Sequence, residues 1–353
     1  MKHLLRIGIL STVTACTTLS AHAGMGWLQL PSGEGQGPIT VFYPTQAEEV
    51  TSTFGPFTVR VASGAAPEAG NHRLIVISHG SGGNAWVHSD LSRALVQAGY
   101  IVALPEHNGD NYKDVGKIGP RSWVLRPKEV SRAIDVLAAD TRFAPLFDAR
   151  RVGMWGMSAG GHTALTLAGG RWNQAALLQH CEDHLAEDFA TCTGGFTALN
   201  DNWLDSIKKA VAMPIIRYKL RRNDESQSES HDNWYGHTDP RIAAIIAGVP
   251  FAVDFDPATL RVPSVPLGLI QAQGDIWLRP QFHSGPLIAA CTTCELLADL
   301  KIGGHGALLS PLPSQVPASI ARLIADPPGF ERAQTVARIN TVSISFFNQH
   351  LQP

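Results

Sequence analysis

The chain reads Arg151-Val-Gly-Met-Trp155, then Gly156-Met157-Ser158-Ala159-Gly160, then Gly161-His-Thr-Ala-Leu-Thr-Leu-Ala168. The first segment is short and apolar, which is typical of a buried strand, and the last favours a helix. The middle segment has the pattern G-x-S-x-G. A strand, a sharp turn and a helix around this pattern place a serine at the carboxyl end of a strand. The stretch therefore predicts an α/β fold.

Ser158 is the candidate nucleophile of this turn. The turn holds the serine in a strained backbone conformation, so the residues two positions away must be very small. Gly156 and Gly160 meet that need, and Gly161 allows the helix to pack closely on the strand. The alternative interpretation is a glycine-rich turn with an inactive serine. The strand–turn–helix context favours the nucleophile.

Strands and helices alternate along the rest of the chain. Apolar runs predict strands at residues 38–43, 57–61, 74–78, 101–105, 242–249, 267–272 and 296–302. Apolar residues at helical spacing predict helices at about 86–98 and 335–349, and a helix that begins at Pro127. This alternation indicates a mostly parallel central sheet flanked by helices.

Residues 171–238 interrupt this alternation directly after the nucleophile helix. They contain two cysteines, a basic run and a polar run. They also contain an apolar stripe with a spacing of four, made of Leu199, Trp203, Ile207 and Val211. One interpretation is a surface excursion with a solvated charged face. The other is a cap-like insertion that covers the serine and contacts substrate.

A nucleophilic serine needs a base, and the base needs an acid to orient it. Asp275 follows the predicted strand at 267–272, and His305 follows the last predicted strand in a loop flanked by glycines. Acid and then histidine is the order in which these groups follow a serine of this kind. We therefore expect a triad of Ser158, Asp275 and His305. The weaker candidates are Asp254 and Asp256 as acids and His283 and His350 as bases.

Such a serine also needs fixed N–H donors for the oxyanion that forms during attack. One expected donor is the amide of Ala159, directly after the nucleophile. The other is the amide of Ser81, in the loop His79-Gly80-Ser81-Gly82-Gly83 that follows the strand at 74–78. His107 also ends a strand at this edge of the sheet, where a structural role is favoured over a pocket role.

The first 23 residues have the pattern of an export signal, with a positively charged start, an apolar stretch and the small-residue site Ala21-His22-Ala23. Cleavage there would leave a domain of residues 24–353. Val13-Thr14-Ala15-Cys16 also resembles a bacterial lipobox, which would leave a lipid anchor at Cys16. Both interpretations predict a domain outside the cytosol, periplasmic, secreted or lipid-anchored.

Four cysteines remain beyond the signal: Cys181, Cys192, Cys291 and Cys294. In an exported protein they predict two disulfides. Of the three pairings we favour the local one, Cys181 with Cys192 and Cys291 with Cys294. The alternative for Cys291-Thr-Thr-Cys294 is a redox pair, but a thioredoxin-like βαβ context is missing. Histidine and cysteine spacings do not suit zinc, and we expect no metal and no other cofactor.

Composition limits the partners of the chain. Its 353 residues carry 28 Lys and Arg against 30 Asp and Glu, and the net charge of −2 gives no reason to expect a nucleic-acid partner. Beyond the signal, no apolar run approaches the roughly 20 residues of a membrane span. One large α/β domain with the insertion at 171–238 is expected.

With these residues placed, the chain resembles the α/β-hydrolase superfamily. It is most similar to the bacterial predicted dienelactone hydrolases, a branch related to platelet-activating factor acetylhydrolase. The matching motifs are His79-Gly80, the Gly156–Gly160 turn, Asp239-Pro-Arg-Ile, Gly274-Asp275 and Gly304-His305. Dienelactone hydrolases proper use a cysteine nucleophile, so dienelactone is not carried over as substrate.

The resemblance implies a cofactor-free serine esterase that acts on small-molecule or lipid-like esters through an acyl-enzyme intermediate. Two alternatives remain. An amidase or peptidase would use the same triad, and a binding protein on a hydrolase scaffold would use none of it.

Overall fold

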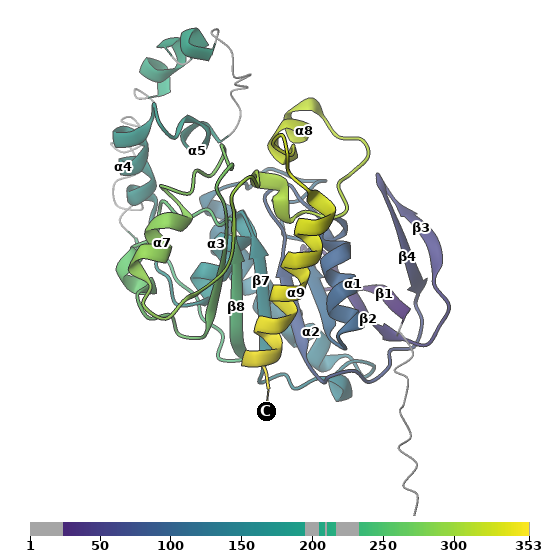
Figure 1. Cartoon of the computed structure of the whole chain (residues 1–353). Helices are drawn as coiled ribbons and strands as arrows, with labels where there is room; N and C mark the ends of the chain where they lie inside the picture. The colour runs from purple at the N-terminus through teal and green to yellow at the C-terminus, as the bar shows by residue number, and fades with distance from the viewer. Residues whose placement is uncertain (1–23, 195–204, 209, 217–232, 353) are drawn as a thin grey trace, which may run out of the picture.

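Ten strands form one sheet, in the order β10-β9-β8-β7-β5-β6-β2-β1-β4-β3 (Figure 1). A computed structural model describes residues 24–194, 205–208, 210–216 and 233–352. The six strands from β10 to β6 run parallel, and β2 and β1 extend the sheet antiparallel. The strands are β1 (Gly24–Leu30), β2 (Ile39–Thr45), β3 (Val50–Phe54), β4 (Phe57–Ser63), β5 (Leu74–Ser78), β6 (Ile101–Pro105), β7 (Val152–Met157), β8 (Ile242–Gly248), β9 (Leu267–Ala272) and β10 (Glu295–Leu300). The predicted parallel sheet is confirmed.

Helices cover both faces of the sheet. In Figure 1, α1 and α9 lie in front of it and α2 and α3 lie behind it. The α-helices are α1 (Ser89–Gln97), α2 (Pro120–Ala139), α3 (Ala159–Leu167), α4 (Gln174–His184), α5 (Phe189–Thr193), α7 (Ser284–Ala290), α8 (Ala318–Ile324) and α9 (Arg332–His350). The short 3-10 helices are η1 (Ala85–His88), η2 (Ala144–Leu146), η3 (Pro257–Leu260) and η4 (His305–Leu308).

Strand β5 shows why a continuous apolar run fits the centre of this sheet. Its side chains alternate between two cores, one on each face. Ile75 and Ile77 join the core beneath α1 and α9, and Leu74 and Val76 join the core beneath α2. All four side chains are fully buried. The strand therefore holds the loop that follows it, residues 79–83, on a rigid support.

Helix α2 corrects the sequence prediction. It begins at Pro120, and Pro127 lies inside it, two turns later than a first-turn proline would lie. An interior proline leaves the carbonyl four residues earlier, that of Trp123, without its usual helical donor. The helix tolerates this loss because its early turns are anchored by side chains. Ser122 and Arg126 both hydrogen-bond to Asp110, and Trp123 is buried.

Strand β1 was not predicted from the sequence. Its seven residues include two glycines, which weaken the strand pattern. Pairing with a strand on each side compensates for this weak strand propensity, because β1 is antiparallel to β2 and parallel to β4. Tertiary pairing therefore overrides local propensity here. Smaller differences occur at β10, which ends at Leu300, and at α9, which begins at Arg332.

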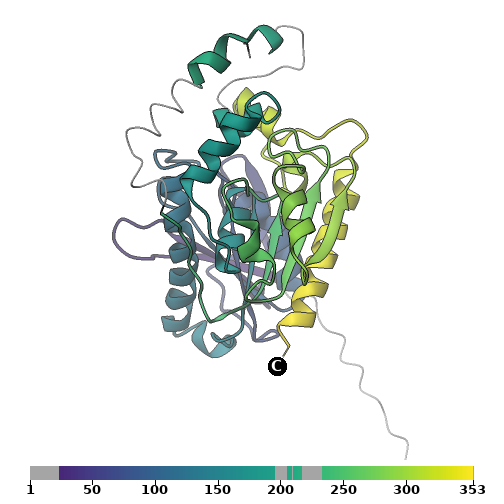
Figure 2. The same ribbon diagram turned by 90° about the vertical axis from the view of Figure 1, so that its left-hand side faces the viewer.

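The insertion predicted at residues 171–238 leaves and returns at one place. The main chains of Trp172 and Tyr235 exchange two hydrogen bonds, and their rings stack at 4.7 Å. Between them, α4 and α5 lie above α7 in Figure 1, and Figure 2 shows the same segment from the side. Leu199 and Trp203 lie outside the described residues. Ile207 and Val211 are more than half exposed, so neither packs the insertion onto the sheet.

Both predicted disulfides are present. Cys181 on α4 bonds to Cys192 on α5, and Cys291 bonds to Cys294 between α7 and β10. Disulfides of this kind are typical of proteins in oxidising compartments. The predicted signal at residues 1–23, with Cys16, lies outside the described residues. Within those residues, no helix is long and apolar enough to cross a membrane.

Candidate active site

Ser158 lies in the sharp turn between β7 and α3. Its backbone has φ 57° and ψ −118°, in the left-handed half of the Ramachandran map that a serine rarely enters. Neighbouring glycines make the turn geometrically feasible. A Cβ atom on Gly156 would lie 2.0 Å from the carbonyl oxygen of Gly160, and one on Gly160 would lie 1.9 Å from the carbonyl oxygen of Ser78. The predicted strand–turn–helix context is thus present.

His305 reaches Ser158 from the far end of the sheet. It begins η4, the short helix after β10, and its Nε2 lies 3.1 Å from Ser158 Oγ. Its Nδ1 lies 2.7 Å from Asp275 Oδ2. With the Nδ1 proton donated to this carboxylate, Nε2 is free to accept the hydroxyl proton of Ser158. The structure therefore brings the three predicted residues into one hydrogen-bonded chain.

Asp275 is held in turn by the loop that follows β9. Its second oxygen, Oδ1, accepts hydrogen bonds from the amides of Trp277 at 2.8 Å and Leu278 at 2.9 Å. Asp275 and His305 are 3% and 6% exposed, so water is largely kept from the carboxylate–imidazole contact. A carboxylate fixed on both oxygens orients the ring in one direction.

The predicted oxyanion loop lies directly against the serine. A Cβ atom on Gly80 would lie 3.4 Å from Cβ of Ser158, so Gly80 packs against the nucleophile. The loop is tightened by a hydrogen bond of 3.0 Å from the amide of Gly83 to the carbonyl of Gly80. Ala159 is the first residue of α3, where helix geometry supplies no acceptor for its amide. The loop that carries Ser81 and the start of α3 at Ala159 thus both adjoin Ser158.

The rival acids and bases all have other partners. Asp254 pairs with His162 at 3.1 Å, and Asp256 caps η3 through the amide of Ala258. His283 Nδ1 accepts a hydrogen bond from the amide of Ala252, and His350 contacts Glu295. None of these contacts involves Ser158. The geometry therefore favours the predicted triad over these alternatives.

His107 is a buried structural residue. Its Nε2 lies 2.7 Å from Ser78 Oγ and its Nδ1 lies 2.6 Å from Glu129 Oε2. Burial, together with the nearby Arg126 guanidinium, holds the pKa of His107 well below its usual value. Burial raises the pKa of Glu129. The favoured structural interpretation of His107 agrees with this placement.

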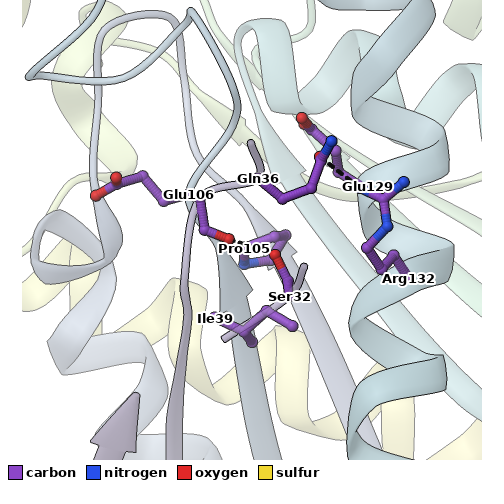
Figure 3. A pocket seen from close by; sticks show the side chains of 8 residues that line it. Ser32, Gln36, Ile39, Pro105, Glu106, Glu129 and Arg132 are labelled. Carbon is purple, nitrogen blue, oxygen red and sulfur yellow. Dashed lines mark hydrogen bonds between the residues drawn. The ribbon is translucent and has the colours of Figure 1, made fainter. Parts of the chain in front are cut away.

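A small cavity lies behind Glu129, away from the serine. Figure 3 shows Gln36, Glu129 and Arg132 around it, between the β1–β2 connection and α2. Its volume of about 10 Å³ is at the lower limit for one water molecule. A larger cavity of about 300 Å³ lies beside Glu49 and Arg60. Neither is lined by Ser158, Asp275 or His305.

Sequence reasoning missed a buried ion pair beneath the oxyanion loop. Arg126 on α2 and Asp110 in the loop after β6 are both fully buried and lie 2.8 Å apart. The position of Asp110 after a strand at the catalytic edge was a usable signal. Arg126 was hidden because the helix was expected to begin one residue later, at Pro127.

The donor set does not indicate a metal site. Within the ranges that the structure describes, no group of three or more His, Cys, Asp or Glu side chains is arranged to hold a metal ion. Ser158, His305 and Asp275 instead provide a hydroxyl next to an imidazole and a carboxylate.

Comparisons with known proteins extend the fold assignment. No family model and no curated protein matches the sequence. Among solved structures, a ferulic acid esterase from Streptomyces cinnamoneus is similar over 96% of this chain and 92% of its own, with a TM-score of 0.58 and 16% sequence identity. The fold is that of the α/β-hydrolases. At this identity the likeness concerns the fold, and the function needs its own argument.

Proposed function

We propose that this protein is a serine hydrolase that cleaves carboxylic esters. The observation that carries the proposal is the hydrogen-bonded chain from Ser158 Oγ through His305 to Asp275. A serine hydroxyl is a weak nucleophile unless a base removes its proton. Here a base is within hydrogen-bond distance, and its orientation is fixed by a carboxylate that is itself hydrogen-bonded.

The proposed reaction has two halves. His305 Nε2 takes the proton of Ser158 as Oγ attacks the ester carbonyl, and the imidazolium then gives this proton to the departing alcohol. An acyl group remains on Ser158. Water, deprotonated by His305, attacks the acyl carbonyl and releases the acid. Asp275 keeps the Nδ1 proton in place and stabilises the imidazolium in both halves.

The amides of Ser81 and Ala159 are the proposed donors to the oxyanion. Donors of this kind act where negative charge develops, and losing one costs about 10²–10³ in kcat in other serine enzymes. Gly80 supports this assignment because it packs against Ser158 without a side chain that would block the carbonyl. The donors would bind the tetrahedral intermediate more tightly than the ground-state ester.

The comparison supports an ester as substrate, since the similar structure is named a ferulic acid esterase. Assignment to the dienelactone hydrolase and acetylhydrolase branch rests on the sequence motifs alone. Export is proposed from the signal pattern at residues 1–23 and from the two disulfides.

The insertion is proposed to select the ester. Its α5 contacts the loop that carries the triad acid, because Thr191 Oγ1 donates a hydrogen bond of 3.1 Å to the carbonyl of Trp277. Trp277 is also a donor to Asp275. The insertion therefore lies against the loop that carries Asp275.

The test is a panel of p-nitrophenyl esters of increasing acyl length, with the matching anilides, assayed on the wild type and on Ser158→Ala. We expect the wild type to hydrolyse the esters. Ser158→Ala should keep its fold and lose about 10⁴–10⁶ in kcat. Faster cleavage of the anilides would indicate an amidase. A folded wild type that cleaves neither series, or a Ser158→Ala variant with near wild-type turnover, would contradict the proposal.

A further inference from the structure

A fully buried ion pair lies directly beneath the proposed oxyanion loop. Arg126 Nη2 contacts Asp110 Oδ2 at 2.8 Å, and both side chains are 0% exposed. Burial alone raises the pKa of Asp110, but the Arg126 guanidinium and hydrogen bonds from Ser122 and Gly82 outweigh it, so the pKa lies below its usual value. Both groups are therefore charged.

A buried ion pair is weak evidence for a role in stability. Desolvating two charges costs several kcal/mol, and a well-packed apolar pair of similar volume is often equally stable. The contacts of this pair suggest a different role, because most of them go to one short loop rather than to the core.

Both members of the ion pair form hydrogen bonds to that loop. Asp110 Oδ1 accepts a hydrogen bond of 2.9 Å from the amide of Gly82, and Oδ2 accepts one of 3.3 Å from Ser81 Oγ. Arg126 donates from Nη1 to the carbonyl of His79 at 2.5 Å and from Nη2 to the carbonyl of Gly80 at 3.5 Å. Four consecutive residues of the loop are thus held by one ion pair.

These bonds also set the direction of two amides. The peptide bonds after His79 and Gly80 are trans, so each carbonyl and the following N–H point in opposite directions. Because Arg126 binds the carbonyls of His79 and Gly80, the N–H groups of Gly80 and Ser81 point away from it. Within the described residues, the structure pairs neither amide with an acceptor. Gly80 lies against Ser158 on this loop.

We propose that Arg126 and Asp110 are positioning residues that aim the amides of this loop at the oxyanion. The inference rests on the proposed ester hydrolysis and adds to it the source of the loop's rigidity. Neither side chain touches the reacting atoms. An amide displaced by about 1 Å would lose roughly 10²-fold in rate, since preorganised donors act through geometry.

The chain offers a control ion pair that is anchored to the same helix. Arg241 binds Asp239 at 2.7 Å and also donates to the carbonyl of Ser131 and to Asp135, both on α2. This pair precedes β8, at the edge of the sheet opposite to Ser158. Arg241→Lys therefore disturbs an ion pair anchored to α2 without touching the loop at 79–83.

The experiment compares Arg126→Lys and Arg241→Lys in ester hydrolysis, in melting temperature and in affinity for a trifluoromethyl ketone, which forms an oxyanion on the serine. We expect Arg126→Lys to lower kcat by about 10–100-fold, with KM changed by less than about threefold, and to weaken ketone binding by a similar factor. The pH profile of kcat/KM keeps its wild-type midpoint, because His305 is not altered. Arg241→Lys lowers the melting temperature and leaves kcat within about twofold.

Ser122→Ala provides a second variant that does not depend on a buried charge. It removes the hydrogen bond of 2.6 Å to Asp110 Oδ2 and one of 2.8 Å from Arg126. We expect a smaller loss of kcat, about threefold to tenfold, again with KM unchanged. Unchanged kcat and ketone affinity in a folded Arg126→Lys or Ser122→Ala protein would overturn the inference, as would an equal loss of kcat in Arg241→Lys. A wild type that cleaves no ester would instead overturn the proposed function, and the inference with it.

Discussion

Two buried Asp–His pairs lie at the carboxyl ends of neighbouring strands. After β9, Asp275 meets His305 at 2.7 Å, and after β8, Asp254 meets His162 at 3.1 Å. All four residues are at most 6% exposed. By residue type and burial, the two pairs are nearly alike.

They differ in what the second ring nitrogen meets. His305 Nε2 faces Ser158 Oγ, whereas His162 Nδ1 meets no hydrogen-bonding partner among the described residues. His162 lies on α3, one turn after the serine, and its ring packs at 4.6 Å on both Trp123 and Phe255. An Asp–His pair serves the serine only when its free nitrogen reaches the hydroxyl; otherwise it is part of the core.

The largest expected contrast separates the two histidines. His305→Ala removes the proposed base and should lower kcat by about 10⁴–10⁶. Asp275 keeps its hydrogen bonds from the amides of Trp277 and Leu278, so the loss of stability should be smaller than in His162→Ala. His162→Ala leaves the Asp254 carboxylate buried without its partner and should cost about 3–5 kcal/mol of stability. Its kcat should stay within about tenfold of the wild type. Steady-state kinetics and urea unfolding of both variants check the contrast, and a kinetic collapse in folded His162→Ala would break it.

The two aspartates provide a finer comparison. Asp275→Asn keeps the shape of the acid but no longer favours the Nδ1 proton on His305, so kcat should fall by about 10⁴. Asp254→Asn should change kcat by less than about tenfold, and the same holds for Asp256→Asn, which affects only the cap of η3. The reverse ranking of kcat values would move the acid to the end of β8.

Removing the disulfide between α4 and α5 tests whether the protein can lose stability while the proposed triad stays active. Replacing both Cys181 and Cys192 by serine should cost about 3 kcal/mol, because the unfolded chain regains the entropy of a short loop. Hydrolysis of an acetyl ester should persist. Thiol titration of denatured, unreduced wild type should find almost no free thiol among the four cysteines of residues 24–353, and two or more would refute the pairing.

The smallest effect concerns a third buried histidine. Burial and the neighbouring His79 lower the pKa of His88 to about 3. The unfolded chain, with a pKa near 6.5, therefore binds one more proton between these values, and stability falls as the pH drops below about 6.5. His79 and His107 have pKa shifts of the same direction.

In His88→Leu, unfolding should take up one proton fewer than in the wild type between pH 6 and 4. The slope of the unfolding free energy against pH should therefore fall by about 1.4 kcal/mol per pH unit in this range. Urea unfolding across this range measures the slope. His184→Gln, at a position where 41% of the side chain is exposed, is the control and should leave the slope as it is. An unchanged slope in His88→Leu would show that this ring is protonated equally in both states.

The sequence predicted those features that depend on local pattern. The run at Leu74–Ser78 and the glycines around Ser158 fixed the strands and the turn, and the order of Asp275 and His305 after two strands indicated the proposed triad. Both disulfides followed from short separations along the chain. Each of these signals is contained in a short stretch of the chain or in the order of such stretches, so it is readable without the fold.

Features that depend on packing between distant segments were not predictable. Asp110 lies in the loop before α2, and Arg126 lies in the second turn of that helix. The sequence prediction that the helix begins at Pro127 left Arg126 outside it and concealed the pair. Likewise the sequence leaves Asp254 as a rival acid, because its partner His162 lies 92 residues earlier in the chain. Charge pairing across the sheet edge leaves no periodic signal in the sequence.

We propose that Ser158 is the nucleophile and that His305 activates it. The most direct measurement is reaction with diethyl p-nitrophenyl phosphate, which transfers one phosphoryl group to an activated serine and releases nitrophenolate. We expect one nitrophenolate per wild-type molecule, the phosphoryl group on Ser158 by peptide mass mapping, and parallel loss of ester hydrolysis. Folded Ser158→Ala and His305→Ala should not be labelled. Labelling at another residue, or a wild type that cleaves esters without reacting, would contradict this proposal.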